Sequence, residues 1–434
     1  MLRPADRHTS PQTWDTRYEI EAIGVLTLGF GLVGLDRFII NPLSPVIMRD
    51  LHLDYRDLGN MAAAVASTWG LSALFLGRLS DRVGRREVLI PTVVAFSVLV
   101  GCTGLAQGIT SLLVLRALMG FAEGGFAPSS IAVAMDASHP RRRGFNLGLH
   151  QNGLPLVGLG LGPVLATQLL AVLPSWRWVF VLLTLPGLIT AYLMHRIVRN
   201  AKSTIEDRPV GATSHPRSPW SHALSYRNVV LGVGIMSCVA SALNVAIVMS
   251  PTYLTEELHL PMTQMGFVMS AVGIGAVLGG FTLPALSDLL GRKPVLVGAC
   301  ALACVFLALF MKSGANAWGL FAWLLLFAGF GFSVIYVTVG PLTAESVPPT
   351  LVATAIGLIT GTGEIMGGAG APALAGQIAH RIGVSNAYVL ALLILAIGFL
   401  LTLAVREPAA GRSRLPLDPA SELLQAHTGA EHVE

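Results

Sequence analysis

The stretch GRLSDRVGRREVL, residues 77–89, has a partial copy later in the chain, PALSDLLGRKPVL at residues 284–296. Asp81 in the first stretch and Asp288 in the second are 207 residues apart. Each stretch joins the second and third long apolar runs of its half of the chain. A repeat on this scale is typical of membrane proteins built from two similar halves. We therefore expect two related bundles with the same order of helices.

The composition excludes an ordinary soluble domain. Of the 434 residues, 53% are hydrophobic and 12% are charged, whereas soluble domains carry about 25% charged residues. The mean hydropathy is +0.67, and the short alternating strands of a membrane β-barrel do not occur. The four cysteines lie in apolar runs without the spacing of metal ligands, so we expect buried thiols and no metal site. These features favour a helical protein that crosses a membrane many times.

Twelve apolar segments are long enough to cross roughly 30 Å of hydrocarbon. They lie near residues 21–47, 58–79, 87–108, 110–136, 145–172, 176–196, 228–254, 263–286, 294–313, 317–343, 351–379 and 386–405. The expected fold is an all-α membrane protein with twelve transmembrane helices in two pseudo-symmetric six-helix bundles. The expected division is a cytoplasmic tail at 1–20, a bundle at 21–196, a cytoplasmic linker at 197–227, a second bundle at 228–405 and a cytoplasmic tail at 406–434.

The basic residues predict the orientation in the membrane. Of the 28 Lys and Arg residues, 21 lie in the tails and loops on one side of the spans and five on the other. The remaining two, Arg37 and Arg116, lie inside spans. Because basic loops stay in the cytoplasm, both termini are predicted to be cytoplasmic, and the protein is expected in the plasma (inner) membrane.

The first copy of the repeat resembles the loop signature of the major facilitator superfamily. The matching residues are Gly77, Asp81, Arg82, Gly84, Arg85 and Arg86, and the second copy keeps Asp288, Gly291, Arg292 and Lys293. The second copy departs from the pattern at Pro284 and Leu289. The resemblance implies transport by alternating access, with these residues as a conformational latch. Glycine allows close helix packing, and an aspartate can cap a helix and pair with arginine. The alternative is an anchor that only sets the orientation.

Two spans show a closer resemblance. Residues 34–45 read GLDRFIINPLSP, and helix 4 carries Arg116, Leu118, Gly120, Glu123, Phe126 and Pro128 in an R-x-L-x-G-x-x-E-x-x-F-x-P pattern. Together they resemble the anion:cation symporters, which include bacterial sugar-acid carriers and sialin-type carriers. Spinster-like lipid carriers have a similar arrangement. The resemblance implies protonation at the acidic positions of helices 1 and 4 and anion binding at the arginines.

The residues themselves support a charged site inside the bundle. Arg116 and Glu123 are seven apart in LLVLRALMGFAEGGF, residues 112–126, so they share one helix face. Each buried charge costs roughly 3 kcal/mol, and such residues almost always face the bundle interior or water. Asp36 is expected at the depth of Glu123. We expect Asp36, Arg37, Arg116 and Glu123 to gather and to pair with one another.

Two interpretations of this cluster remain open. In the first, it is a static network that holds helices 1 and 4 together. In the second, Asp36 and Glu123 carry protons, while Arg37 and Arg116 bind an anion. Burial favours the neutral form of a carboxyl and a nearby arginine favours the charged form. An anion that binds the arginine would therefore weaken the effect of the arginine on the carboxyl group. The carboxyl group would then accept a proton.

Neutral polar groups complete the predicted site. Asn244, Tyr253 and Tyr336 in the second half, with Gln151 and Asn152 in helix 5, are candidates to bind the uncharged parts of a substrate. Glu364 in helix 11 is a further candidate proton carrier. For each of them, packing between helices is the alternative interpretation.

These observations predict a secondary transporter that couples a proton gradient to symport of a small organic anion, such as a sugar acid. No Walker A pattern occurs, so we expect no ATP site and no cofactor. No hydrolase motif indicates an enzyme, nothing indicates nucleic-acid binding, and a monomer in the bilayer is expected. The alternatives are a drug/proton antiporter, a spinster-like exporter of lysolipid or another amphiphile, and a non-transporting scaffold or sensor. GLGLGP at 158–163 favours the antiporter, but Ala166 and Thr167 replace the paired glycines that usually follow.

Overall fold

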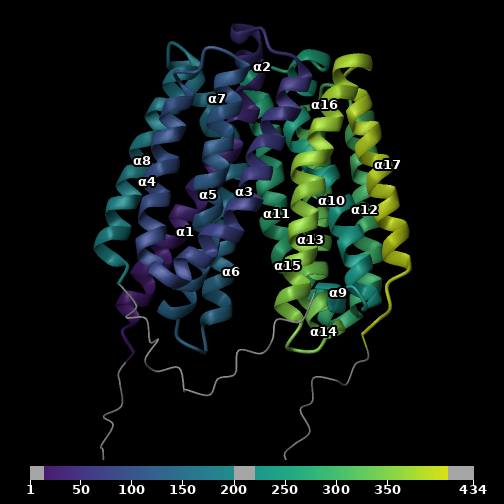
Figure 1. Ribbon diagram of the computed structural model, residues 1–434. Helices are drawn as coiled ribbons and strands as arrows, with labels where there is room; N and C mark the ends of the chain where they lie inside the picture. The colour runs from purple at the N-terminus through teal and green to yellow at the C-terminus, as the bar shows by residue number, and fades with distance from the viewer. Residues whose placement is uncertain (1–13, 200–219, 409–434) are drawn as a thin grey trace, which may run out of the picture.

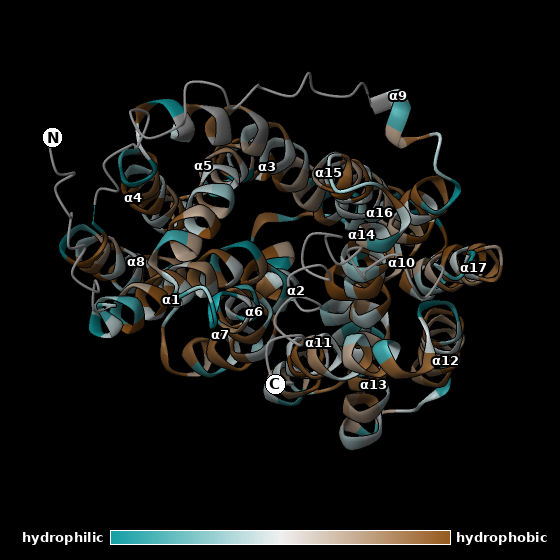
Figure 2. Cartoon of the chain, turned by 90° about the horizontal axis from the view of Figure 1, so that it is seen from below, coloured by the Kyte–Doolittle hydropathy of each residue, from teal (hydrophilic) through white to brown (hydrophobic). Residues whose placement is uncertain are grey.

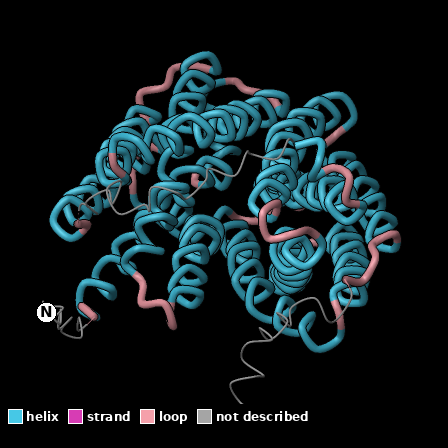
Figure 3. The backbone as a smooth tube through the Cα atoms, turned by 60° about the horizontal axis from the view of Figure 1, so that its bottom comes forward, coloured by secondary structure: helices cyan, strands magenta, loops and turns pink. Residues whose placement is uncertain are grey.

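The computed structural model describes residues 14–199 and 220–408. The predicted tails and linker therefore lie largely outside the described residues. Within the described ranges the secondary structure is helical and the connections are short (Figure 3).

The first half of the chain forms six helical units, which lie on the left in Figure 1. The units of both halves are called helices 1 to 12 in chain order. Helix 1 is interrupted at Ile39, and helix 5 contains a π-helical segment. The bounds are α1 (Thr16–Phe38) with α2 (Ile40–Leu51), α3 (Tyr55–Val83), α4 (Arg85–Thr103), α5 (Ile109–Ala137), α6 (Arg143–Gly153) with η1 (Leu154–Leu161) and α7 (Gly162–Val172), and α8 (Trp176–Ile197).

The second half repeats this order on the right of Figure 1, after the short helix α9 (Trp220–Ala223). Its units are α10 (Arg227–Thr252) with η2 (Tyr253–Glu257), α11 (Met262–Leu290), α12 (Arg292–Lys312), α13 (Ala317–Val337) with η3 (Thr338–Leu342) and α14 (Thr343–Ser346), α15 (Val352–Gly363) with η4 (Glu364–Gly370) and α16 (Ala371–Ile382), and α17 (Val384–Leu403). Segments η1 to η4 are π-helical.

The predicted twelve helices in two bundles are confirmed. In the described part of the chain, ten helices are long and apolar enough to cross a membrane. The other two long units are α3 and residues 352–382. Brown, hydrophobic residues run along the helices of both halves (Figure 2), and large apolar side chains such as those of Phe75 and Leu393 are exposed. Exposed apolar surface of this extent fits a lipid environment rather than water.

The backbone repeats the 207-residue offset seen in the sequence. His52 and His259, which follow helices 1 and 7, both have φ of 52°. Gly84 and Gly291, which follow helices 2 and 8, have φ of 119° and 96°. Glycine is favoured at the second pair because this region is strained for residues with a Cβ atom. The two halves are therefore pseudo-symmetric in conformation as well as in sequence.

Helices 5 and 11 share an unusual feature. In each, a π-helical segment leads into a proline, Pro163 after η1 and Pro372 after η4. Proline lacks the N–H group that would continue the α-helical pattern, and π-helical turns occur frequently at functional sites. Both segments pack across the boundary between the halves, η1 on α11 and η4 on α3.

The two halves are held together mainly at one end of the molecule. We call the end where α1 begins and α17 ends the terminal end, and the opposite end, where α2 ends, the distal end (Figure 1). At the distal end, a Cβ atom on Gly59 would lie 2.3 Å from the Pro372 carbonyl oxygen, so the helices touch there. The hydroxyl group of Tyr55 donates to Glu256 at 2.5 Å across the same boundary. Segments η1, α7, η4 and α16, rather than α6 and α15, make the main contacts with the opposite half.

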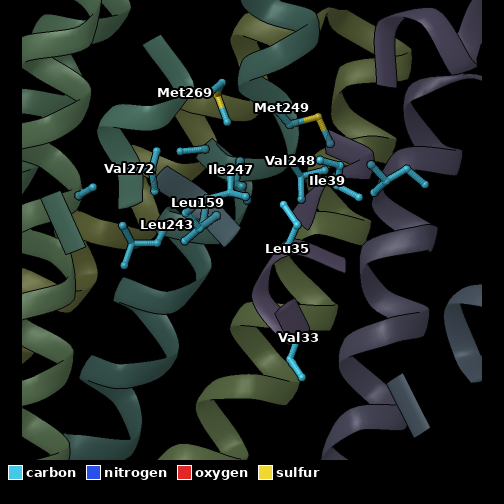
Figure 4. Close-up of a cluster of buried hydrophobic side chains, with 14 of the residues drawn as sticks. Val33, Leu35, Ile39, Leu159, Leu243, Ile247, Val248, Met249, Met269 and Val272 are labelled. Carbon is cyan, nitrogen blue, oxygen red and sulfur yellow. The ribbon is translucent and has the colours of Figure 1, made fainter. Parts of the chain in front are cut away.

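An apolar cluster joins the halves near the middle of the bundle. Figure 4 shows Leu35 and Ile39 of helix 1 beside Val248 of α10, with Leu159 of η1 close to other side chains of α10. All four side chains are buried. The charged site described below lies next to this cluster.

Candidate functional site

The two arginines predicted inside the bundle, Arg37 and Arg116, line a small cavity between the halves. The cavity has a volume of about 30 Å³, which is room for one or two water molecules. Its lining is mostly apolar, with two arginines and two asparagines. The lining residues are Arg37, Phe38, Ile40, Asn41, Leu58, Met61, Ala62, Val65, Arg116, Asn244, Val248 and Gly368.

Arg116 is a fully buried arginine without an ion-pair partner among the described residues. Its side chain is 1% exposed, and no carboxylate oxygen lies within 4.0 Å. Its Nη1 atom approaches the carbonyl oxygens of Asp36 and Arg37 at 3.4 and 3.3 Å. These carbonyls lie at the end of α1, where helix 1 breaks and the helix dipole is negative. The Nε and Nη2 atoms have no hydrogen-bond partner. The guanidinium group therefore keeps two donors for a further acceptor.

Glu123 is equally buried and also unpaired. The residue is 0% exposed, and both of its carboxylate oxygens lack a hydrogen-bond partner. The charges of Arg37 and Arg116 act on it without direct contact. A buried carboxylate without partners is expensive, so this environment favours the protonated form.

Arg37 pairs across the boundary between the halves. Its guanidinium group forms an ion pair with Glu364 of η4, and both side chains are largely buried. It also lies over the ring of Trp69 of α3, 5.4 Å from the centroid. This contact is a cation–π interaction. Arg37 thus connects helix 1 to helix 2 of its own half and to helix 11 of the other half.

The predicted gathering of charges differs from the structure in its pairing. Asp36 is 3% exposed and lies near enough to Glu123 and Arg116 for their charges to interact. However, neither arginine forms an ion pair with either of these carboxylates. Arg37 pairs instead with Glu364 of the second half. Glu364 therefore joins the cluster, which the prediction had confined to the first half.

The neutral candidates divide into two groups. Asn244 lines the cavity beside both arginines, and its amide donates to the carbonyl oxygen of Ala240 at 2.9 Å. Asn152 and Tyr336 meet near Gly280, where a Cβ atom would lie 3.7 Å from Asn152 Oδ1 and 3.0 Å from the Tyr336 ring. Asn152 Oδ1 is buried without a partner. Residues of opposite halves therefore lie on either side of Gly280.

The other two neutral candidates lie elsewhere. Tyr253 is buried in the second half, with its ring centroid 5.0 Å from Tyr388 and 5.9 Å from Phe310. This position suits packing between helices 7, 9 and 12. Gln151 is exposed, and it does not line the cavity.

The first latch motif connects the start of helix 3 to helices 4 and 6. Arg85 forms an ion pair with Asp136 and donates to the carbonyl oxygen of Ala132 at 3.1 Å. Arg86 donates to the carbonyl oxygen of His195. Arg82 is exposed. The side chain of Asp81 lies outside the described residues, so capping by Asp81 stays a prediction.

The second motif makes the corresponding connections in the second half. Arg292 forms ion pairs with Asp288 and with Glu345, which lies near the end of helix 10. The distance from Arg292 Nη2 to Glu345 is 2.6 Å. The backbone N–H groups of Arg292 and Lys293 donate to Glu407 at 2.6 and 2.7 Å. Arg85 with Asp136 and Arg292 with Glu345 are thus equivalent ion pairs, each joining its motif to the fourth helix of its half.

Several site residues were missed by the sequence analysis. Asn41 lines the cavity. It lies in the stretch GLDRFIINPLSP, residues 34–45, where a neutral residue before Pro42 gives no signal of a binding site. Trp69 lies in helix 2, which offered no buried charge as a signal. The buried pair Ser130 and His150, with Nε2 3.1 Å from Oγ, could have been noticed because Ser130 lies seven residues after Glu123.

The fold and the site together define a class. Twelve helices in two related halves, with a small cavity lined by two arginines at their boundary, are an architecture found in membrane transporters. The sequence pattern of the Major Facilitator Superfamily matches residues 26–253 and 231–427. The chain belongs to this superfamily, and the predicted resemblance is confirmed.

Several similar proteins are named as transporters of small organic molecules. The chain is 29% identical over 336 residues to a probable 4-methylmuconolactone transporter of Cupriavidus pinatubonensis, covering 76% of each chain. It is 28% identical over 272 residues to a hexuronate transporter of Bacillus subtilis, covering 60% of this chain and 64% of that one. Among solved structures, a bacterial homolog of the human lysosomal transporter Spinster, in an inward-facing and unoccupied conformation, matches with a TM-score of 0.74. The identity is 17%, and the match covers 89% of this chain and 97% of that chain.

Proposed function

We propose that this protein imports a small organic anion together with protons, through the cavity between its halves. The observation that carries the proposal is the state of Arg116. A buried guanidinium group with two unpartnered nitrogen atoms, Nε and Nη2, is costly unless an acceptor arrives, and a carboxylate accepts in a matching two-pronged geometry. The named relatives, which carry a lactone acid and hexuronates, support an organic acid as that acceptor.

Proton coupling follows from the two kinds of carboxyl group in the site. Glu364 forms an ion pair with Arg37, whereas Glu123 has no direct partner. An anion that binds Arg116 and Arg37 would remove the positive field from Glu123 and compete with Glu364. Glu123 and Asp36 would then hold protons while the anion is bound. Release of the anion would restore the field and favour release of the protons.

The lining of the cavity favours an acid with a compact apolar body. Apart from the two arginines, only Asn41 and Asn244 offer hydrogen bonds, while Met61, Val65 and other apolar side chains form the rest. A sugar acid would leave several hydroxyl groups without partners against these side chains. We therefore expect an aromatic or lactone acid to bind better than a hexuronate.

The basic loops support an orientation with both termini in the cytoplasm. In that orientation, the contacts at the distal end close the site to the outside. The structure then corresponds to an inward-facing state, with Arg37 and Glu364 paired across the site.

The test is uptake into proteoliposomes under an inward proton gradient, with benzoate and glucuronate as labelled probes. We expect accumulation of benzoate above that of glucuronate, and loss of accumulation when the gradient is collapsed. Tetraphenylphosphonium and lysophosphatidylcholine serve as probes for the antiporter and lipid-exporter alternatives. Accumulation that ignores the proton gradient, or transport of only the cation or the lipid, would overturn the proposal.

A further inference from the structure

A line of buried polar side chains runs from the charged site to the terminal end of the first half. On α5, Arg116, Glu123 and Ser130 follow one another at intervals of seven residues, so all three lie on one helix face. Ser130 and His150 are 0% exposed and lie 3.1 Å apart from Oγ to Nε2. His150 belongs to α6, so it brings a titratable group from helix 5 to this face.

His150 connects the helices that carry the two nearest carboxylates. Its Nε2 atom faces α5, which carries Glu123. The imidazole also lies beside the carbonyl group of Leu26 on α1, which carries Glu19 two turns earlier. The Nδ1 atom is buried and lacks a hydrogen-bond partner. A neutral imidazole has one donor and one acceptor nitrogen, so it can take a proton on one side and release one on the other.

The line continues to the terminal end through Glu19. Asn146, one turn before His150, donates to Glu19 at 2.7 Å and to Ser138 at 3.0 Å. Glu19 is 3% exposed, and Arg142, half-exposed at the end of the bundle, donates to it at 2.7 Å. The other donors to Glu19 are the Trp14 indole and the backbone N–H of His139.

We infer that His150 and Ser130 form a proton relay between Glu123 and Glu19. This relay reaches solvent at the terminal end, beside Arg142. The inference deepens the proposed function, on which it rests. Glu123 needs such a route, because its carboxylate oxygens are closed to solvent while the halves are closed at the distal end. All members belong to helices 1, 4 and 5, so the relay stays intact when the two halves move relative to each other.

The proton steps balance as follows. The O–H bond of protonated Glu123 breaks as its proton passes to a bridging water molecule. That water gives a proton to the imidazole by way of Ser130, and the imidazole releases the proton on its other nitrogen to water beside Glu19. The step from Glu123 to Ser130 covers two helical turns, about 10 Å, so it requires bridging water beside the small side chain of Ala127. One proton leaves Glu123 and one reaches the solvent.

Charged groups around His150 bear on its protonation. They come from α1, α5 and the start of α6, the helices packed around it. The charged groups on these helices are Arg17, Glu19, Glu21, Asp36, Arg37, Arg116, Glu123, Asp136, Arg142 and Arg143. Among the described residues, none of these groups is within hydrogen-bond distance of the imidazole.

The test separates proton movement from substrate movement. In proteoliposomes with benzoate as the probe, His150→Gln should slow gradient-driven accumulation by at least about tenfold and flatten its pH dependence, because a positioned proton-transfer group is worth this much or more. Counterflow of benzoate at equal pH on both sides should stay near the wild-type rate. Ser130→Ala should show the same split, and His222→Gln, at an exposed histidine, is the matched control.

The relay would be overturned by either of two results. The first is that His150→Gln and Ser130→Ala keep the wild-type rate of gradient-driven accumulation and its pH dependence. The second is that both variants lose counterflow together with accumulation, which would indicate packing between helices 4 and 5 rather than proton transfer. The proposed function fails separately, if wild-type protein shows no gradient-driven uptake of benzoate or glucuronate.

Discussion

Arg116 and Glu123 lie on one face of α5, yet each is unpaired. Their spacing of seven residues separates them by about 10 Å along the helix, which is too far for a direct ion pair. The Arg116 side chain instead lies at the end of α1, where its Nη1 atom donates to the carbonyl oxygens of Asp36 and Arg37. The static-network interpretation needs the charges to neutralise each other in contact, and this arrangement gives it little support.

Replacing Arg116 separates the two interpretations of the site. Arg116→Met removes a buried charge without breaking an ion pair, so the free energy of unfolding should change by no more than about 1 kcal/mol. Breaking a buried pair would instead cost about 3–5 kcal/mol. The same variant should bind the transported acid about 10- to 100-fold more weakly, because hydrogen bonds to a charged group are worth about 1.5–3 kcal/mol. Thermal unfolding and titration calorimetry of purified protein measure the two effects.

The sequence predicted the charged residues but not their partners. Asp36, Arg37, Arg116 and Glu123 could be identified because charges inside apolar spans stand out against their surroundings. The pair of Arg37 with Glu364 could not, because it depends on how the two halves pack against each other. Trp69 and His150 likewise gain their importance only from helix packing.

At the scale of elements, helices 5 and 11 combine a π-helical segment with close packing on the opposite half. Near η1, a Cβ atom on Gly273 of α11 would lie 2.1 Å from the backbone nitrogen of Gly160. Backbone atoms cannot move aside as a flexible side chain would. The halves can therefore touch here only while position 273 is glycine.

Gly273→Ala should weaken this contact between the halves. Gly298→Ala on α12 is the matched control, because a Cβ atom there would meet nothing within 4 Å. The control should be neutral or stabilising by up to about 1 kcal/mol, since alanine favours helix more than glycine. Spin labels on the distal ends of helices 2 and 11 should show a longer mean distance in Gly273→Ala alone. Equal distances in both variants would contradict the role given to this contact.

At the distal end, the protonation of Asp54 is expected to make the stability of the folded protein depend on pH. It caps α3 by accepting from the backbone N–H groups of Arg56 and Asp57, and it lies 3.3 Å from His380 of α16. Burial alone would raise the pKa of Asp54, but the bonds from Arg56 and from the backbone N–H groups hold the pKa below its usual range. The carboxylate therefore adds stability that is complete above the ordinary carboxyl pKa and is lost as the pH falls through the lowered value.

Asp54→Asn keeps a good capping residue and removes this titration. Between about pH 5 and pH 2, its thermal stability should fall less steeply than that of the wild-type protein. Asp54→Ala should lose about 1 kcal/mol at neutral pH as well, because the cap is removed. Identical slopes for wild type and Asp54→Asn in thermal unfolding would refute this assignment.

At the scale of the whole molecule, the two halves share a scaffold but not a site. His52 with His259, and Gly84 with Gly291, keep the 207-residue offset in backbone conformation. The repeated stretch at 77–89 and 284–296 was enough to predict this scaffold, because each copy marks the same loop. The charges do not follow the repeat: Arg116 and Glu123 correspond to Trp323 and Phe330. Which conformation the molecule adopts could not be predicted, because it depends on glycine contacts between segments far apart in the sequence.

The ion pair between Arg37 and Glu364 should bias the equilibrium between conformations. Glu364→Gln removes the charge that competes with an anion for Arg37, so benzoate should bind several-fold more tightly while gradient-driven accumulation falls. Titration calorimetry and uptake in proteoliposomes measure the two quantities. Weaker binding in Glu364→Gln would contradict competition between Glu364 and the substrate.

The most direct test of the central claim is proton movement driven by the anion. Proteoliposomes containing a pH-sensitive dye, with equal pH on both sides, are supplied with an inward gradient of benzoate, and the lumenal pH is followed after correction for passive acid permeation in protein-free vesicles. The account predicts acidification by wild-type protein and none by Glu123→Gln, although this variant still exchanges benzoate in counterflow. Acidification by Glu123→Gln at the wild-type rate would contradict the account.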